Sequence, residues 1–403
     1  APVGSVLAKK KVVAKDIGGI KSNGFLCSAE ELGLEEHSEG IILLSQDCHV
    51  DDDINDILKL PDNIYDIDLT PNRGDCFSAF GIARELCAFL ESSFSPEYVA
   101  PKLLKGPQRS LNLEIEDYKA CPRYSAAILE GIENNVVLPI KIKERLRRAG
   151  IQSVNPVVDI TNYVMLKTGQ PLHAFDASKT SSKTLRVRKG RNGEKLDLLN
   201  EDQIALDEDC LVIASDKEVI ALAGVMGGLS SGVYAETERV ILESAFFNPI
   251  SIARTARKFN IQTDASTRFE RGVDPLSIEI GLLKAANLIK EICGGEISKI
   301  DVQKISKYNE KYFEFNPQLL EKISGLKISY SEILRILKNL GFEIKKNKKF
   351  LKLKVPSWRP DIDQPIDVVE ELVRIHGYNR IKKIDPIKSR IKPTLNKSQK
   401  LFH

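Results

Sequence analysis

His173 is the one histidine near the middle of the chain, and it lies in the apolar, turn-rich segment Gly169–Asp176. Histidine suits general acid–base catalysis because its ordinary pKa, about 6.5, is close to neutral pH. No cysteine forms a recognisable catalytic motif with a histidine, so a cysteine nucleophile is not indicated. His173 is either a general base or a structural residue that makes hydrogen bonds.

Glu243 is a single carboxylate in an apolar stretch, between Ile241-Leu242 and Ala245-Phe246-Phe247. Burying a carboxylate costs free energy unless it finds a partner. One interpretation is that Glu243 recognises a hydroxyl group of a ligand. The alternative is a salt bridge with Arg268 or Arg271.

Three further segments supply hydrogen-bonding side chains or sharp turns. They are Asp159–Tyr163, the glycine turn Gly224–Gly228, and Thr263–Ser266. We expect these segments to converge with Gly169–Asp176 and Glu243 on one small-molecule pocket, which the rest of the chain holds and presents to a larger partner.

A second group of chemically useful residues lies near the end of the chain. Asp367, Glu370, Glu371 and Arg374 follow the i, i+3, i+4, i+7 spacing of one helix face, and Asp361 precedes them. Clustered carboxylates repel one another unless a cation or a basic partner holds them, and hard oxygen ligands favour magnesium. The alternative is that Asp367 interacts with the helix dipole while the glutamates are simply exposed.

The length and the amino-acid composition limit the class of protein to which these residues can belong. A chain of 403 residues predicts two to four domains, and 42% hydrophobic with 29% charged residues is typical of a globular protein. The sequence contains no run of about 18 apolar residues, so no membrane helix is predicted. The seven scattered cysteines indicate reduced thiols and a cytoplasmic location. Both ends look cut, so we expect a fragment of something longer.

The elements that position these residues are predicted from periodicity and turn signals. Residues 1–58 are expected to form short strands, at 6–13, 24–28 and 41–44, as in a small barrel or sandwich. Ile64–Leu69 alternates as a half-buried strand does, and it leads through the turn Thr70–Asp75 into a helix. Residues 59–110 are therefore interpreted as a strand–turn–helix connector.

The largest predicted domain covers residues 111–305 and mixes strands and helices, which is typical of the α+β class. Strands are expected at 111–115, 124–128, 185–187, 211–214, 219–222 and 240–242, and helices at 139–149, 156–166, 250–259 and 276–293. Residues 306–385 predict a winged-helix-like unit, with a helix after Pro317, a second at 331–340, and a hairpin at 343–344 and 350–355. Its lysine-rich tip, Lys345–Lys349, is either a phosphate-backbone contact or a solvated loop.

Five motifs occur in a characteristic order: Thr70–Asp75, Asn162–Met165, Gly169–Asp176, Thr263–Asp274 and Pro356–Asp361. Together they closely resemble the β subunit of bacterial-type phenylalanine–tRNA ligase, over nearly the whole chain. The resemblance implies a multidomain α+β protein. It implies a truncated oligonucleotide-binding (OB) barrel at 1–58 that binds tRNA, a partial connector at 59–110, an editing domain at 111–305, a winged-helix-like domain at 306–385, and the start of a truncated catalytic-like domain at 386–403. The beginning of the subunit and its C-terminal catalytic-like and anticodon-binding domains would lie outside this chain.

The same resemblance implies a function. With an alpha subunit, in an α2β2 heterotetramer, the whole enzyme would attach phenylalanine to tRNA(Phe) using ATP bound by the alpha subunit. The editing domain would hydrolyse mischarged Tyr-tRNA(Phe). The implied pocket residues are Thr161, Asn162, Pro171, His173, Gly227, Glu243, Thr263 and Ala265, with His173 positioning the substrate rather than acting as a base. The implied magnesium ligands are Asp361, Asp367, Glu370 and Glu371. The alternative is a non-catalytic tRNA-binding scaffold with the same fold, which would not need the polar pocket residues.

Overall fold

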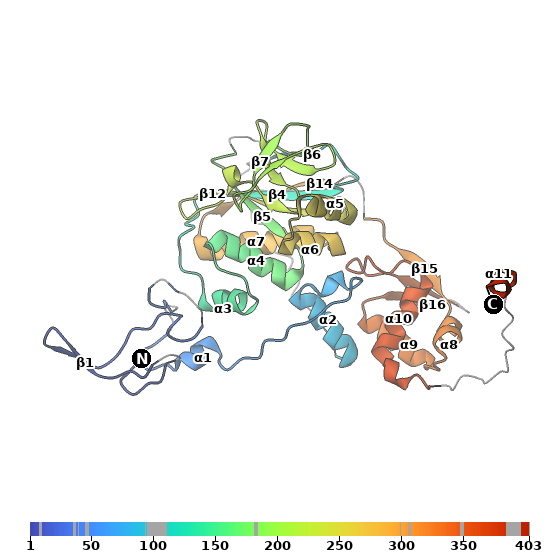
Figure 1. Ribbon diagram of the computed structural model, residues 1–403, viewed down its shortest axis with the longest axis horizontal. Coiled ribbons are helices and arrows are strands. Elements are labelled where there is room, and N and C mark those ends of the chain that lie inside the picture. Colours follow the sequence, from blue (N-terminus) through green and yellow to red (C-terminus); the bar gives the residue numbers. More distant parts are fainter. Residues whose placement is uncertain are drawn as a thin grey trace. The chain divides into compact units, whose positions relative to one another are not determined.

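The computed structural model describes residues 1–7, 10–34, 38, 40–44, 48–92, 94, 111–180, 184–298, 300–304, 308–346, 350–383 and 396–402. The chain divides into two compact units. The first comprises Ala1–Phe80 and Glu97–Lys307, and the second comprises Gly81–Pro96 and Tyr308–His403. Figure 1 labels the elements of both units, and their mixture of helices and sheets confirms the predicted α+β class.

One sheet of the first unit carries the strands next to the candidate site. Its strand order is β13-β4-β12-β5, and β14 also pairs with β4, with every pairing antiparallel. The bounds are β4 Arg123–Glu130, β5 Leu172–Asp176, β12 Arg239–Phe246, β13 Glu296–Ile297 and β14 Asp301–Lys304. The strands predicted at 124–128 and 240–242 are confirmed as parts of β4 and β12. The segment interpreted as turn-rich instead contains β5, which pairs with β12 along its whole length.

A second sheet in this unit has the strand order β11-β10-β9-β6-β3 and is antiparallel except for the parallel pair β3 and β6. The bounds are β3 Asn112–Ile115, β6 Thr184–Lys189, β9 Leu211–Ala214, β10 Val219–Leu222 and β11 Met226–Gly227. The four strands predicted in this region are confirmed. A small hairpin of β7 (Lys195–Asp197) and β8 (Gln203–Ala205) was not predicted.

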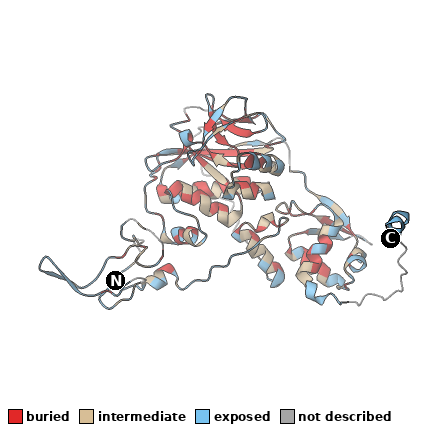
Figure 2. Ribbon diagram, in the orientation of Figure 1, coloured by how far each residue is buried: buried red, intermediate tan, exposed pale blue. Residues whose placement is uncertain are grey.

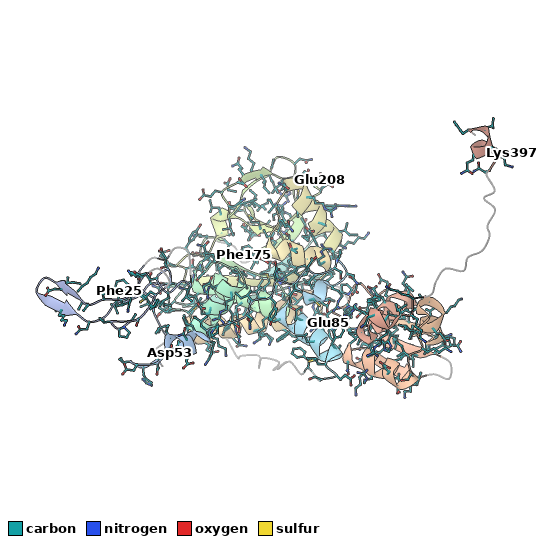
Figure 3. All side chains as sticks on the ribbon, turned by 60° about the horizontal axis from the view of Figure 1, so that its bottom comes forward. Phe25, Asp53, Glu85, Phe175, Glu208 and Lys397 are labelled. Carbon is teal, nitrogen blue, oxygen red and sulfur yellow. The ribbon has the colours of Figure 1, made fainter. Side chains whose placement is uncertain are left out.

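Helices cover one face of the first sheet and the second sheet lies on the other. Because successive side chains of a strand point to opposite faces, Leu129 and Leu242 join a core with helices α4 and α7. Ile241 and Phe175 point the other way, into a core shared with the second sheet. Figure 2 shows the buried residues of this unit gathered in the sheets and in α4 and α7, and Figure 3 shows Phe175 among densely packed side chains.

The helices of the first unit begin and end where the sequence supplies caps. The bounds are α3 Ile140–Arg148, α4 Pro156–Thr168, α5 Pro249–Phe259, α6 Asp264–Arg271 and α7 Ile278–Cys293. Asn155 caps α4 by accepting a hydrogen bond from the amide of Val158, and Pro156 occupies its first turn. Gly169 ends the same helix in the left-handed conformation, with a φ of 83°. Four of these helices were predicted, and α6 was not.

The N-terminal prediction is wrong in its strands. Within residues 1–58, the described part contains one two-stranded hairpin, β1 (Lys15–Ile17) with β2 (Ile20–Ser22), and a short helix α1 (Ile54–Leu58). The segments 24–28 and 41–44 form no strand beyond an isolated bridge at Gly24, and the described residues of 6–13 contribute an isolated bridge between Val6 and Lys11. The truncated barrel stays a prediction, because the described residues of 1–58 show none of its three expected strands. β-rich composition predicts an extended backbone, but a strand also needs a partner with which to exchange hydrogen bonds.

Ile64–Leu69 is likewise no strand, and the Ile64 and Tyr65 side chains are 67% and 78% exposed. The turn that follows packs against α6: a Cβ atom on Gly74 would lie 2.7 Å from the Arg271 carbonyl oxygen. The expected helix follows as α2 (Ala79–Phe89) after a short 3-10 turn, η1 (Gly74–Cys76). Residues 95–110 of the predicted connector lie outside the described residues.

The described part of the second unit contains a three-stranded sheet, the helices α8 to α11 and most of α2. The strand order is β15-β17-β16, all antiparallel. The bounds are β15 Tyr312–Phe315, β16 Glu343–Lys346, β17 Leu351–Lys354, α8 Gln318–Ser324, α9 Tyr330–Asn339 and α10 Pro365–His376. The predicted helices and hairpin are confirmed, β15 was missed, and residues 347–349 of the lysine-rich tip lie outside the described residues. Ala88 of α2 is part of this core although it is distant in sequence. Of residues 386–403 the structure describes only 396–402, with α11 at Lys397–Leu401.

None of the helices in the described part of the chain combines the length and the apolar character that a membrane crossing requires.

Candidate functional site

Glu243 and His173 are direct neighbours on adjacent strands. In the pairing of β12 with β5, Glu243 lies opposite His173, two positions along from the pair Ile241 and Phe175. Because residues two apart on a strand share a face, both side chains project toward the second sheet. Two residues that are 70 positions apart in sequence are thus brought together by strand register.

A pocket opens on this side of the sheet and leaves about 60 Å³ for water-sized molecules. In such a measure about 10–15 Å³ holds one water, so the pocket has room for several waters or a small group. Five of the predicted pocket residues line it: Pro171, His173, Gly227, Glu243 and Ala265. The other lining residues are Leu172, Ile213, Ala221, Leu222, Gly224, Val225, Met226, Phe247 and Phe269. Within the described lining, only Glu243 and His173 have polar side chains.

Gly227 has no room for a side chain. A Cβ atom built at this position would lie 2.5 Å from Cε1 and 2.6 Å from Nε2 of His173. The imidazole therefore packs directly against the Gly227 backbone. The absence of a side chain at position 227 lets the ring reach its place in the pocket.

Thr263 supports the pocket without lining it. It caps α6: its hydroxyl accepts from the amide of Ser266 (3.0 Å) and donates to the carbonyl of Val225 (2.9 Å). The second bond joins the start of α6 to the glycine turn that forms one wall. Thr263 thus fixes two lining segments relative to each other.

Thr161 and Asn162 do not line the pocket either. Both lie on α4, and the Thr161 hydroxyl donates to the carbonyl of Val158 within that helix (2.7 Å). The structure therefore brings together five of the eight predicted pocket residues, with Thr263 directly behind them. No placement in the structure tests the roles predicted for Thr161 and Asn162.

Burial dominates the protonation of Glu243. The residue is 4% exposed, and loss of hydration raises the pKa of its carboxyl group to about 8; the neighbouring Tyr124 hydroxyl offsets this only in part. Among the described residues, no hydrogen-bond partner reaches its Oε2 atom. The alternative of a salt bridge is wrong for Arg268, which donates to Asp264 and to the Phe77 carbonyl. No ion pair joins Glu243 to Arg271 or to any other described residue.

His173 is shifted in the opposite direction. Its ring lies among apolar atoms and packs edge-on against Phe175, with 4.6 Å between ring centroids. Burial lowers its pKa to about 4. His173 is therefore neutral at neutral pH and a weak base there, which favours the positioning interpretation over general-base catalysis.

The four acids predicted to hold magnesium lie in the second unit, on and just before α10. Both oxygens of Asp361 accept from Arg359, at 2.9 and 2.7 Å. Glu371 accepts from Arg359 (2.7 Å) and twice from Arg374 (3.1 and 2.8 Å). Burial alone would raise the pKa of Glu371, but these hydrogen bonds outweigh it and lower the pKa to about 2.

The remaining two acids are placed differently. Asp367 accepts from the backbone amides of Asp363 and Gln364 at the start of α10, at 2.8 and 2.9 Å, and Glu370 is exposed. Over the described ranges, no three His, Cys, Asp or Glu side chains come close enough to hold a metal ion. With arginines and backbone amides on three of its four carboxylates, this donor set does not fit a magnesium ion in this arrangement. The magnesium site stays a prediction.

Tyr124 and the second-sheet residues Ile213, Ala221 and Leu222 were not predicted as parts of the site. Tyr124 lies diagonally across from Glu243 in the pairing of β4 with β12. No local signal points to these residues, because their proximity to Glu243 depends on which strands pair and in which register. Only the alternation of apolar residues in the strands shows that they are buried.

Comparison with known proteins places this fold and pocket in a class. Residues 120–294 match the B3/4 domain family, and residues 313–378 match the tRNA synthetase B5 domain family. The chain is thus of the class of tRNA synthetase chains that combine these two domains.

Individual relatives point to one kind of synthetase subunit. A phenylalanine–tRNA ligase beta subunit of Legionella pneumophila (strain Lens) is 41% identical over 373 residues, which is 90% of this chain and 46% of the relative. The beta subunit of Francisella tularensis subsp. tularensis is 40% identical over 392 residues, 96% of this chain and 49% of the relative. The chain belongs to the phenylalanine–tRNA ligase beta subunit family. It spans about half the length of the curated relatives that it matches.

Proposed function

We propose that this chain is the part of a phenylalanine–tRNA ligase beta subunit that removes tyrosine from mischarged tRNA(Phe). Family membership supports an aminoacyl-tRNA as the class of substrate, and the pocket between the two sheets of the first unit would select the amino acid. In the complete beta subunit, assembled with an alpha subunit and using ATP, the larger activity would be attachment of phenylalanine to tRNA(Phe).

The observation that carries the proposal is the buried carboxyl group of Glu243, without a hydrogen-bond partner for Oε2 in an otherwise apolar pocket. An apolar synthetic site rejects an analogue that merely adds a hydroxyl by only about 100-fold, so tyrosine enters where phenylalanine binds. A site whose buried polar group hydrogen-bonds the ligand hydroxyl discriminates much more strongly. It rejects the analogue that lacks the hydroxyl, because the polar group of the site is then left unpaired. Glu243 would accept a hydrogen bond from the tyrosine phenol, and phenylalanine would leave it unpaired.

The pocket residues favour hydrolysis by a positioned water. No cysteine, serine or lysine side chain lines the pocket among the residues that the structure describes, and His173 is neutral. Water would attack the ester carbonyl carbon, a new C–O bond would form, and the bond to the ribose oxygen would break. The proton lost by water ends on that ribose oxygen. The role of the chain is to bind and orient the ester, which by itself can supply a large part of the rate enhancement.

The test is deacylation of Tyr-tRNA(Phe), measured with this chain and with the complete subunit assembled with its alpha partner. We expect hydrolysis of Tyr-tRNA(Phe), little hydrolysis of Phe-tRNA(Phe), and loss of the difference in Glu243→Ala. A complete complex that binds the tRNA but leaves Tyr-tRNA(Phe) intact would exclude editing and leave the scaffold alternative.

A further inference from the structure

Tyr124 brings a phenolic hydroxyl close to Glu243 from the neighbouring strand β4. In the pairing of β4 with β12, Tyr124 lies opposite Ala245, and Ala126 lies opposite Glu243. Tyr124 and Glu243 are therefore diagonal neighbours on the same face of the sheet, within reach of a long side chain. Tyr124 does not line the pocket, so it stands behind Glu243 as seen by a ligand.

Both polar groups are buried and lack a hydrogen-bond partner in the described part of the chain. Tyr124 is 1% exposed, and the atoms concerned are its phenolic oxygen and Oε2 of Glu243. An unpaired buried hydroxyl costs free energy comparable to a lost hydrogen bond. Two such groups side by side, on strands that fix their register, are a pair in which the hydroxyl can donate and the carboxylate can accept.

The surroundings of Glu243 offer no other support for a negative charge. His173 faces it from β5 and is neutral, and Cys121 lies close before β4 with its thiol pKa raised by burial and then by the charge of Glu243. The residues that approach from the second sheet and from α6 are apolar: Ile213, Ala221 and Ala265. No cation pairs with Glu243 among the described residues. The Tyr124 hydroxyl is a neutral donor that the carboxylate can use in addition to the ligand.

We propose that Tyr124 is a positioning residue whose hydroxyl donates to the Glu243 carboxylate and holds it in the orientation that accepts a ligand hydroxyl. This inference rests on the proposed function for its ligand, tyrosine, but not for the contact between the two residues. Tyr124 touches neither water nor ester. It acts through Glu243: one bond from Tyr124 fixes the rotation of the carboxylate, and the remaining acceptor positions of its two oxygens stay available to the ligand.

The contact itself is tested without tRNA, by following the Glu243 carboxyl carbon with NMR during a pH titration. Glu243→Gln assigns the signal because it removes it. Removing the Tyr124 hydroxyl in Tyr124→Phe takes away a donor that favours the charged form, so we expect the titration midpoint of Glu243 to rise by about 1 pH unit. Tyr118→Phe, at an exposed position, is the matched control and leaves the midpoint unchanged.

The consequence for selection is tested in the complete complex by the pH profile of Tyr-tRNA(Phe) hydrolysis after subtraction of the uncatalysed rate. We expect the rising limb in Tyr124→Phe to move to higher pH by the same shift, whereas a merely structural role would lower the rate equally at every pH. An unchanged Glu243 midpoint in folded Tyr124→Phe overturns the inference. If that variant does not fold, the Tyr124 ring signal in Glu243→Gln decides: it changes if the two groups are bonded, and an unchanged signal refutes the contact. Absence of hydrolysis by the wild-type complex would refute the proposed function and leave both NMR outcomes readable.

Discussion

A methyl group on Gly227 would lie 2.5 Å from Cε1 of the His173 ring, well inside van der Waals contact. One ring edge and one stretch of backbone therefore share a wall of the pocket, and neither can change without moving the other.

Gly227→Ala is predicted to displace the His173 ring and to lower Tyr-tRNA(Phe) hydrolysis at least about 10-fold. Overpacking a buried site of this kind typically costs about 1–3 kcal/mol of stability. Deacylation assays and thermal unfolding measure the two effects. Gly24→Ala is the control, because a Cβ there meets only the Ala1 carbonyl oxygen at 3.3 Å. Wild-type hydrolysis in Gly227→Ala would show that the position of the ring is unimportant.

Glu243→Gln is predicted to stabilise the fold, and increasingly so between pH 4.5 and 8. The folded pKa is raised from 4.5 to about 8, so in this window the unfolded chain has released a proton that the folded chain keeps. Stability of the wild type therefore falls as the pH rises through the window, and glutamine removes that loss. The difference, by linkage, is on the order of a few kcal/mol and is measured by urea unfolding at several pH values.

His173→Gln is the matched control, because its effect on stability is expected on the acid side of neutral pH. The folded pKa of His173 is lowered from 6.5 to about 4, so the stability of the neutral ring is complete above pH 6.5 and is lost as the pH falls toward 4. Glutamine should therefore relieve the wild-type loss on the acid side and have no pH-dependent effect above neutrality. The same pH dependence in both variants would mean that burial does not set these two protonation states.

His173→Ala is predicted to impair hydrolysis of Tyr-tRNA(Phe) while leaving tRNA binding intact, because the ring lies at the pocket and is neutral. Deacylation rates and a filter-binding measurement with uncharged tRNA separate the two. Loss of tRNA binding in a folded His173→Ala chain would refute the positioning role.

Much of the first unit could be predicted from sequence because its signals are local. The apolar runs that became β4, β6, β9, β10 and β12 are strands, and the capped helix that begins at Pro156 lies where its periodicity places it. The pocket was anticipated from motifs in four separate segments, and five residues of the predicted set line it.

The errors have a common physical origin in long-range pairing. Ile64–Leu69 alternates like a strand yet has no partner, whereas β5 lacks alternation and is a strand because β12 pairs with it. Tyr124 could not be placed beside Glu243 without the register of β4 with β12. The arginine partners of Glu371 were equally hidden, because Arg359 reaches it from outside the helix.

Thr263→Ala is predicted to cost about 1 kcal/mol, within the usual range for losing an N-cap. It also releases the glycine turn from α6, since the same hydroxyl donates to the Val225 carbonyl. Thr263→Ser keeps the hydroxyl and is the control. Chemical denaturation gives the stability change, and hydrolysis of Tyr-tRNA(Phe) should fall in Thr263→Ala but not in Thr263→Ser. Equal behaviour of the two variants would contradict a role for the hydroxyl.

Glu371→Gln is predicted to destabilise the second unit by about 3–5 kcal/mol, because it leaves Arg359 buried and without full compensation. Glu370→Gln, at an exposed position on the same helix, should change stability by less than about 0.5 kcal/mol.

Since arginines already neutralise Asp361 and Glu371, we expect the chain alone to unfold at the same temperature in EDTA and in millimolar magnesium. A magnesium-dependent rise in the unfolding temperature that Glu370→Gln abolishes would contradict this and would support the predicted metal site.

The folded pKa of Glu371 is lowered from 4.5 to about 2, so its stabilising contribution is complete above pH 4.5 and is lost as the pH falls through 2. Glu371→Gln should therefore show a flatter acid limb of stability than the wild type.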